Sequence, residues 1–211
     1  MDRIVNYLGK IAELTRSIDP RSIRRVSDIL LEAMRERRQV FLFGNGGSAA
    51  TASHFAVDLG KGLQGPGELR LRAHCLVDAV PAMTAWANDT DYSRIFAEQL
   101  ANFVNPEDVV IAFSGSGNSP NVLQGVMAAI ERRALTVGLT GYQGGKLKDL
   151  VDVCITVPSD NMQQIEDLHM ILAHAIYTDL RETLAARPVD VDSQVQGVSP
   201  ARIYPRRIPD A

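Results

Sequence analysis

Five short apolar runs, separated by stretches of helical periodicity, constrain the fold of this chain more than any other feature. The runs occupy residues 40–43, 72–77, 109–113, 136–140 and 153–157. Runs of this length and apolarity are typical of strands that are buried on both faces, as the strands of a parallel sheet are. Their alternation with helices predicts a three-layer αβα sandwich around a five-stranded parallel sheet, with right-handed crossovers between the strands.

Helices are expected between and beyond these strands, because apolar residues recur there at helical spacing. The expected helices span residues 3–17, 22–37, 48–59, 81–87, 93–104, 121–133, 146–150 and 162–184. The first two precede the sheet, and we expect residues 1–38 to form an antiparallel helical arm that packs against another subunit. Residues 39–186 would then form the sheet domain. Residues 187–211 carry four prolines and little periodicity, which predicts an extended or disordered tail.

The composition of the 211-residue chain bounds its partners and its location. A net charge of −3 offers no overall attraction for nucleic acid or for an anionic membrane, so neither partner is expected. Cys75 and Cys154 lie in apolar stretches and are interpreted as core residues of a reducing compartment. The amino terminus lacks the apolar core of a signal peptide, and no run reaches transmembrane length. A cytoplasmic location is therefore expected.

Two loops rich in glycine and serine follow predicted strands and open predicted helices. Loop one is residues 44–48, Gly-Asn-Gly-Gly-Ser, and loop two is residues 114–119, Ser-Gly-Ser-Gly-Asn-Ser. Glycine lets the backbone approach a ligand closely, and a helix amino terminus offers free amides and a positive dipole to an anion. Ligands of a parallel sheet bind beyond the carboxyl ends of its strands, where both loops are expected. The loops therefore predict a phosphate-binding site.

The form of the loops excludes two common nucleotide sites. Neither loop has the lysine of a Walker loop, and loop one lacks the Gly-x-Gly-x-x-Gly pattern of a dinucleotide site. The alternative is an ordinary strand-to-helix turn with a capping serine or asparagine. That alternative explains loop one as well as phosphate binding does, whereas the three serines of loop two exceed the needs of a cap. Loop two is therefore the better candidate for the phosphate.

Four ionisable residues are expected on two helix faces. His54 and Asp58 are four positions apart on the helix after loop one, and Glu166 and His174 are eight positions apart on the last helix. Both spacings place two side chains on the same face of a helix. Two histidines and two carboxylates would suit a divalent metal such as zinc. Such pairs are also common on solvated helices, so the spacing alone leaves both interpretations open.

The order of these motifs resembles that of the sugar isomerase (SIS) domain family and, within it, of the bacterial phosphoheptose isomerases. The resemblance rests on loop one with His54 after it, on Ala87-Asn88-Asp89 and on loop two, and it runs from about residue 3 to residue 184. It implies a flavodoxin-like sandwich and a homotetramer whose active sites are shared between subunits. Loop two would bind the substrate's phosphate. The substrate-binding residues that the resemblance implies are Asn45, Gly46, Gly47, Ser48, Asn88, Asp89, Ser114, Gly115, Ser116, Ser119 and Glu166.

The resemblance also implies an activity, the conversion of sedoheptulose 7-phosphate to D-glycero-D-manno-heptose 7-phosphate through an enediol. This reaction needs a base for the proton that moves between C1 and C2, and a second group for the protons of the two oxygens. We expect Asp58 or Glu166 to be the base and His174 to be the second group. The implied ligands of one zinc ion per subunit are His54, Asp58, Glu166 and His174. Asp58 stands where the family usually has Glu, and Glu166 where it usually has Gln, so the reach of the Asp58 carboxylate is shorter.

Two other functions fit parts of the pattern. One is a non-catalytic SIS-domain binding protein of the type that associates with a replication initiator, whose pattern lacks the paired histidines and acids. The other is an isomerase of a different sugar phosphate, including a heptose of secondary metabolism. The changes at Asp58 and Glu166 leave this second alternative open, because they alter the reacting end of the site.

Overall fold

The computed structural model describes residues 2–65 and 69–186, so the predicted tail at 187–211 lies outside the described residues. Five strands form one sheet in the order β2-β1-β3-β4-β5, and every neighbouring pair is parallel. The strands are β1 (Gln39–Gly44), β2 (Arg72–Cys75), β3 (Val109–Ser114), β4 (Leu135–Thr140) and β5 (Val153–Thr156). This is the flavodoxin-like order, and the predicted five-stranded parallel sheet is confirmed.

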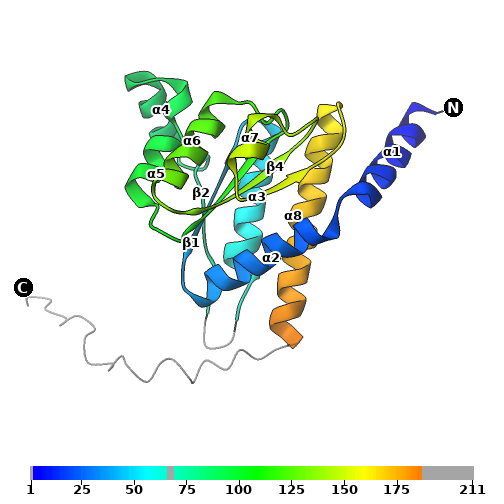
Figure 1. Cartoon of the computed structure of the whole chain (residues 1–211), viewed down its shortest axis with the longest axis horizontal. Helices are drawn as coiled ribbons and strands as arrows, with labels where there is room; N and C mark the ends of the chain where they lie inside the picture. Colours follow the sequence, from blue (N-terminus) through cyan, green and yellow to red (C-terminus); the bar gives the residue numbers. More distant parts are fainter. Residues whose placement is uncertain (1, 66–68, 187–211) are drawn as a thin grey trace, which may run out of the picture.

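Helices cover both faces of the sheet and create two hydrophobic cores (Figure 1). Val40 and Leu42 of β1 face one core, and Phe41 and Phe43 face the other, because successive side chains of a strand point to opposite faces. The first core also contains residues of α2 (Pro20–Arg35), α3 (Gly47–Val57) and α8 (Met162–Ala186). The second core contains residues of α5 (Ala97–Phe103), α6 (Pro120–Glu131) and α7 (Gly145–Leu150). Because helices bury both faces of the sheet, the fold is a three-layer sandwich.

Two of the predicted helices differ in detail from the observed ones. The helix expected over 48–59 ends as an α-helix at Val57, and Asp58–Gly62 continue it as a π-helical turn, η1. The helix expected over 93–104 is divided into a short 3-10 turn, η3 (Tyr92–Arg94), and α5. The segment before it forms α4 (Val80–Asp89), none of whose residues is fully buried. The wider π turn is significant because such turns are frequent at functional sites.

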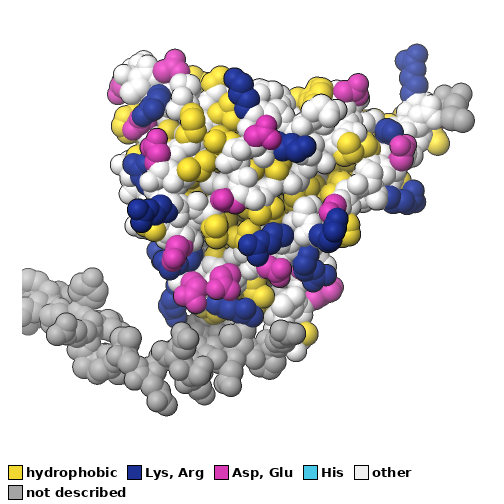
Figure 2. Space-filling view, viewed as in Figure 1, with side chains coloured by type: hydrophobic (Ala, Val, Ile, Leu, Met, Phe, Trp, Pro, Cys, Tyr) yellow, Lys and Arg dark blue, Asp and Glu magenta, His cyan; other side chains and the backbone are white. Residues whose placement is uncertain are grey.

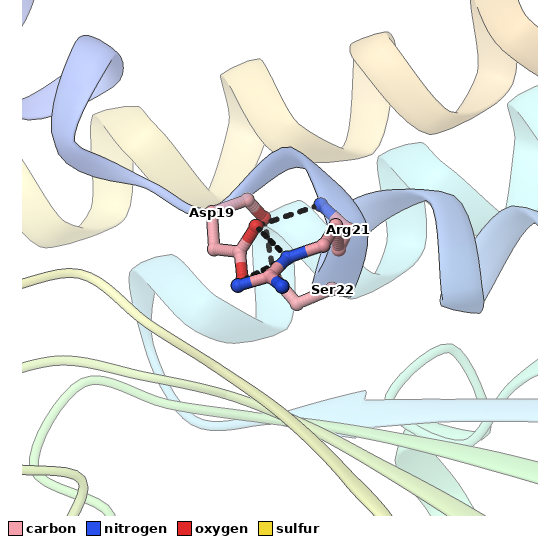
Figure 3. A network of polar contacts seen from close by, with 3 residues as sticks. All are labelled: Asp19, Arg21 and Ser22. Atoms are coloured by element: carbon pink, nitrogen blue, oxygen red, sulfur yellow. Dashed lines mark hydrogen bonds and ion pairs between the residues drawn. The ribbon is translucent and has the colours of Figure 1, made fainter.

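The break between α1 (Arg3–Ser17) and α2 is built by three residues (Figure 3). Asp19 caps α2 by accepting a 3.0 Å hydrogen bond from the Arg21 amide, and its carboxylate also accepts from Arg21 Nε. The Ser22 hydroxyl donates to the Asp19 carbonyl at 2.7 Å. Pro20 occupies the first turn of α2, where its missing N–H costs no helical hydrogen bond. These contacts lower the pKa of Asp19, chiefly through the side-chain hydrogen bond from Arg21.

The predicted helical arm is reduced to α1. α2 buries Val26, Leu30 and Met34 in the first core and packs against α8 and β5, so it belongs to the sandwich and not to a separate arm. Its apolar stripe covers the part of the sheet face that α3 and α8 leave open. α1 instead extends away from the sandwich (Figure 1) and leaves Ile4 and Leu8 more than 60% exposed. α2 therefore shares the first hydrophobic core with the sheet, whereas α1 does not cover the sheet.

No described helix combines the length and the apolarity that a membrane span requires. On the face in Figure 2, basic and acidic side chains are interspersed among apolar ones. Both cysteines are free thiols, and burial raises the pKa of Cys75 to about 11.

Candidate functional site

Loop one turns sharply at the carboxyl end of β1. Gly46 has a φ of 56°, in the left-handed region that favours glycine, and it precedes the first turn of α3 without any side-chain cap. A side chain at Gly44 would collide with the Phe113 carbonyl of β3 and with Ser48. The backbone of loop one therefore lies unusually close to the neighbouring strand. This close approach leaves the amino terminus of α3 open toward loop two.

Loop two forms a tight turn that is closed by its own serines. Ser114 Oγ accepts a 3.1 Å hydrogen bond from the Gly117 amide, and Ser116 Oγ accepts one of 3.2 Å from the Asn118 amide. Ser119 occupies the cap position of α6, but its hydroxyl makes no capping hydrogen bond. A simple capping role therefore does not account for Ser119. Its hydroxyl instead forms a long hydrogen bond of 3.4 Å with Ser114 Oγ.

The segment after β4 holds loop two in place through backbone hydrogen bonds. The Gly141 amide donates to the Gly115 carbonyl at 2.9 Å, and the Leu147 amide donates to the Gly117 carbonyl at 3.0 Å. A side chain at Gly117, whose φ is 65°, would collide with the backbone of Gly144. These contacts fix the shape of loop two before any ligand binds, which lowers the entropic cost of binding.

The two loops enclose a cavity of about 250 Å³ at the carboxyl edge of the sheet. The amino termini of α3 and α6 both open at this edge, which suits an anion. Phe113 and Met162 complete the lining. All the predicted substrate-binding residues except Asn88 and Asp89 line the cavity. They are Asn45, Gly46, Gly47, Ser48, Ser114, Gly115, Ser116, Ser119 and Glu166.

Asn88 and Asp89 lie apart from this cavity in the structure. Both are exposed at the end of α4, and the Asn88 amide donates to Asp89 Oδ1 at 2.8 Å. Tyr92, in the following turn, reaches loop one, where its hydroxyl donates to Asn45 Oδ1 at 3.3 Å. The structure therefore does not bring Asn88 and Asp89 to the sugar position that the sequence suggested.

Asn121 joins loop one to the start of α6 and was missed by the sequence reasoning. Its side-chain amide and that of Asn45 donate to each other's carbonyl oxygens, each at 2.8 Å. Asn121 is only 2% exposed. The one signal in the sequence is a polar residue directly after Ser119-Pro120, where the helical pattern places a buried position.

Three of the four predicted metal ligands meet where α3 and α8 lie side by side. His54 Nε2 and His174 Nε2 are 3.0 Å apart, and Asp58 Oδ2 lies 3.5 Å from the first and 3.8 Å from the second. Asp58 Oδ2 is buried and has no hydrogen-bond partner among the described residues. An unpaired buried carboxylate oxygen is costly, so a cation placed between this oxygen and the two histidines would be stabilising.

The spacing of these three atoms fits zinc. Two ligand atoms of a tetrahedral zinc ion, with bonds of about 2.0–2.1 Å, lie roughly 3.3 Å apart. The separations between the side chains of His54, Asp58 and His174 are close to this value. Both histidine side chains are about half exposed, which leaves room for a further ligand. The donor set thus suits a divalent metal with an open coordination position.

Glu166 lies apart from this group of three. Its carboxylate contacts Gly47 closely enough that a side chain at Gly47 would overlap it, and it lines the cavity between the loops. Glu166 is two helical turns before His174, so α8 carries it to the beginning of α3. The four predicted ligands are therefore divided between the loop cavity and the histidine–aspartate group.

His169, on the same helix, has a structural role. It is fully buried, its Nε2 lies 3.1 Å from the Thr140 carbonyl, and Nδ1 has no partner among the described residues. Burial lowers its pKa to about 4, so the ring is neutral at physiological pH. This supports the interpretation that His169 holds α8 against the end of β4.

Comparison with known proteins places these features in a family context. Residues 6–141 match the SIS domain family. The chain is 36% identical over 154 residues to a phosphoheptose isomerase of Aliarcobacter butzleri, which covers 73% of this chain and 81% of the relative. It is 35% identical over 181 residues to the lincomycin biosynthesis protein LmbN of Streptomyces lincolnensis, covering 81% of this chain and 66% of that protein.

Solved structures agree with these relatives. The phosphoheptose isomerase GmhA of Neisseria gonorrhoeae superposes with a TM-score of 0.79 at 28% sequence identity. The match covers 85% of this chain and 97% of that structure. The similarity therefore extends over most of this chain and nearly all of that structure.

Proposed function

The chain belongs to the SIS domain family and, within it, to the phosphoheptose isomerases, and from this premise we propose that it interconverts sedoheptulose 7-phosphate and D-glycero-D-manno-heptose 7-phosphate. One observation carries the proposal. The same two helices, α3 and α8, bear the loop cavity at their beginning and the histidine–aspartate group further along. From Gly47 to His54 a helix rises roughly 10 Å. That separation favours an elongated substrate, with its phosphate at one end and its carbonyl at the other.

Loop two would take the phosphate. Its serine hydroxyls are neutral donors, and the dipole of α6 adds a favourable field. The Ser119 hydroxyl, which lines the cavity and is not used to cap α6, supports this assignment. Asn45, Gly46, Gly47 and Ser48 of loop one would contact the sugar chain. Asn88 and Asp89 are exposed on α4, so their contribution to binding would require α4 to move toward the cavity.

The chemistry moves one proton between carbon atoms. A base takes a proton from C1 of the ketose, which gives the enediol, and returns it to C2, which gives the aldose. His174 would donate a proton to O2 and accept one from O1, so the charges balance. Its ring is half exposed, and because Nε2 faces His54 and Asp58, Nδ1 is the nitrogen left for this role when a metal is bound.

Two carboxylates can serve as the base. The family resemblance favours Asp58, whose Oδ2 lies between the two histidines. The geometry of this chain favours Glu166, whose carboxylate faces the cavity where the sugar would lie. Because the two groups have different surroundings, isosteric replacement of each will separate their roles.

A zinc ion, one per subunit, would be held by His54, Asp58 and His174. When bound, zinc would stabilise negative charge that develops on the substrate oxygens. The unpartnered Asp58 oxygen and the spacing of the three ligand atoms support this assignment. Glu166 would join the ligand set only after its side chain leaves Gly47.

We further propose a homotetramer in the cytoplasm, with active sites shared between subunits. The support comes from α1, whose side chains Ile4, Val5 and Leu8 are at least 60% exposed. An apolar helix face of this kind requires a partner surface. Tyr7 anchors α1 to α8 through a 2.6 Å hydrogen bond from its hydroxyl to Asp167, one residue after Glu166. A subunit that packs on α1 would therefore lie close to the active site.

A different sugar phosphate is the second candidate substrate. The similarity to a protein of lincomycin biosynthesis supports it, as do Asp58 and Glu166, which change the reacting end of the site. The non-catalytic binding module is disfavoured, because both histidines and both acids are present and three of them converge.

The proposal is tested by incubating the zinc-loaded protein with sedoheptulose 7-phosphate and monitoring the aldose by NMR. Free sedoheptulose is the matched control, since it lacks only the phosphate. We expect turnover of the phosphate ester and little turnover of the free sugar. Preference for a pentose or hexose phosphate would support the second candidate, and binding without turnover of any sugar phosphate would overturn the enzymatic role.

A further inference from the structure

A pair of asparagines joins the two loops beneath the cavity. Asn45 lines the cavity, and Asn121 lies below it in the first turn of α6, where it is 2% exposed. The two side-chain amides donate to each other's carbonyl oxygens at 2.8 Å. Burying a polar side chain costs free energy unless its hydrogen bonds are made within the protein. The reciprocal bonds of this pair meet that condition and fix the orientation of both side chains.

The orientation of Asn121 is fixed by the backbone. Its Oδ1 accepts a 3.0 Å hydrogen bond from the Val122 amide as well as the bond from Asn45. A carbonyl oxygen accepts at two lone pairs, so both are used. The NH₂ group of Asn121 must therefore face Asn45 Oδ1.

This arrangement determines what Asn45 can offer a ligand. Asn45 Oδ1 accepts from Asn121 and from the Tyr92 hydroxyl, at 2.8 and 3.3 Å, so both of its lone pairs are used. Its NH₂ group has two N–H bonds, and one of them donates to Asn121 Oδ1. What remains is one N–H donor, on a residue that lines the cavity.

We propose that Asn121 is a positioning residue, which holds the side chain of Asn45 so that it presents a hydrogen-bond donor, and no acceptor, to an oxygen of the substrate. The identity of that substrate rests on the function proposed above, whereas the positioning itself does not. The donor would suit a carbonyl, an enediolate or a phosphate oxygen and would disfavour a group that can only donate. Asn121 would thus act on the reaction through Asn45 alone.

A double-mutant cycle tests this dependence. We expect Asn45→Ala and Asn121→Ala each to lower kcat/KM for sedoheptulose 7-phosphate by about 3- to 10-fold, the value of one neutral hydrogen bond. The double variant should be no worse than Asn45→Ala, because Asn121 has no other route to the substrate. Losses that multiply, or full activity of Asn121→Ala, would overturn the proposal. Asn105→Ala, an exposed asparagine whose amide bonds the Phe103 carbonyl, is the matched control.

A crystal structure of Asn121→Ala tests the positioning without any substrate. The Asn45 side chain is expected to change its position relative to the wild type. If it does not move, the proposal is contradicted, whether or not the protein has isomerase activity. Absence of turnover in the wild type, with Asn45 displaced in the variant, would refute the proposed substrate and leave the positioning intact. Asn121→Ser serves if the alanine variant fails to fold, because its hydroxyl can still accept from the Val122 amide but is too short to reach Asn45.

Discussion

The Nε2 atoms of His54 and His174 lie 3.0 Å apart although 120 residues separate them in the chain. The parallel sheet creates this contact, because α3 follows β1 and α8 follows β5, and both helices return across the same face. The two helices therefore run in the same direction. Glu166 lies at the start of α3, and His174 lies near its end. The loop cavity thus lies at the start of α3, and the histidine–aspartate group lies further along the same two helices.

Replacing each carboxylate by its amide separates metal binding from the loop cavity. We expect Asp58→Asn to weaken zinc binding, measured by calorimetry, at least tenfold, because Asp58 is the only acid in the group of three. Glu166→Gln should bind zinc as the wild type does. Whichever variant lacks the base should lose about 10²- to 10⁴-fold in kcat. Glu182→Gln, an exposed acid on the same helix, is the control. Equal loss of zinc in the Asp58 and Glu166 variants would instead place Glu166 among the ligands.

Ser119→Ala tests the phosphate role of loop two. Loss of a capping serine usually costs about 1 kcal/mol of stability, but Ser119 makes no capping bond, so the melting temperature should hardly change. The KM for the sugar phosphate should rise several-fold with little change in kcat, since the phosphate is bound equally in the ground and transition states. Steady-state kinetics and thermal melting, with Ser22→Ala as a distant serine control, distinguish this from a structural effect. A large drop in melting temperature with unchanged KM would refute the assignment.

Gly47→Ala should displace Glu166. A methyl group at this position would overlap the Glu166 carboxylate, which is the flexible end of a side chain and can move away. We therefore expect a fold that is retained, as judged by circular dichroism, together with at least a tenfold loss of kcat/KM. Gly9→Ala, on exposed α1 with free space around it, should leave activity unchanged and add helix stability. Full activity of Gly47→Ala would show that the position of Glu166 does not matter.

The buried His169 should make the protein less stable in mild acid. Its pKa is about 4 in the folded protein and near 6.5 when unfolded, so between these values only the unfolded chain binds the proton. The free energy of unfolding should therefore fall as the pH drops through this window, by about 3 kcal/mol in total, with no further loss from this residue at lower pH. Urea denaturation of the wild type and of His169→Gln measures the effect. The variant should show a flatter pH dependence, and parallel profiles would contradict the assignment.

The sheet was predictable from sequence because its strands are apolar on both faces. Runs such as 109–113 carry no alternation that an exposed face would impose, and the observed β3 is buried throughout. The role of α2 was not predictable, because an amphipathic helix looks the same whether it packs on its own sheet or on a partner. Only tertiary contacts, such as those of Val26 and Leu30, decide between the two.

The site was predicted in composition but not in arrangement. Spacing correctly places His54 near Asp58 and puts Glu166 on the helix of His174, yet it cannot reveal that Glu166 lies beside Gly47. That contact depends on how far α8 extends along α3. Asn121 escaped notice because a single buried asparagine has no motif, and its meaning appears only through Asn45.

The most direct test of the proposed reaction is turnover of sedoheptulose 7-phosphate in D₂O, followed by NMR. An enediol formed by a protein base exchanges the transferred proton with solvent, so the aldose should carry deuterium at C2. Substitution of His174 by alanine should lower the rate by about 10²-fold or more. Aldose that still carries no deuterium after prolonged, repeated interconversion would contradict the enediol route, and retained binding without any aldose would contradict the isomerase function itself.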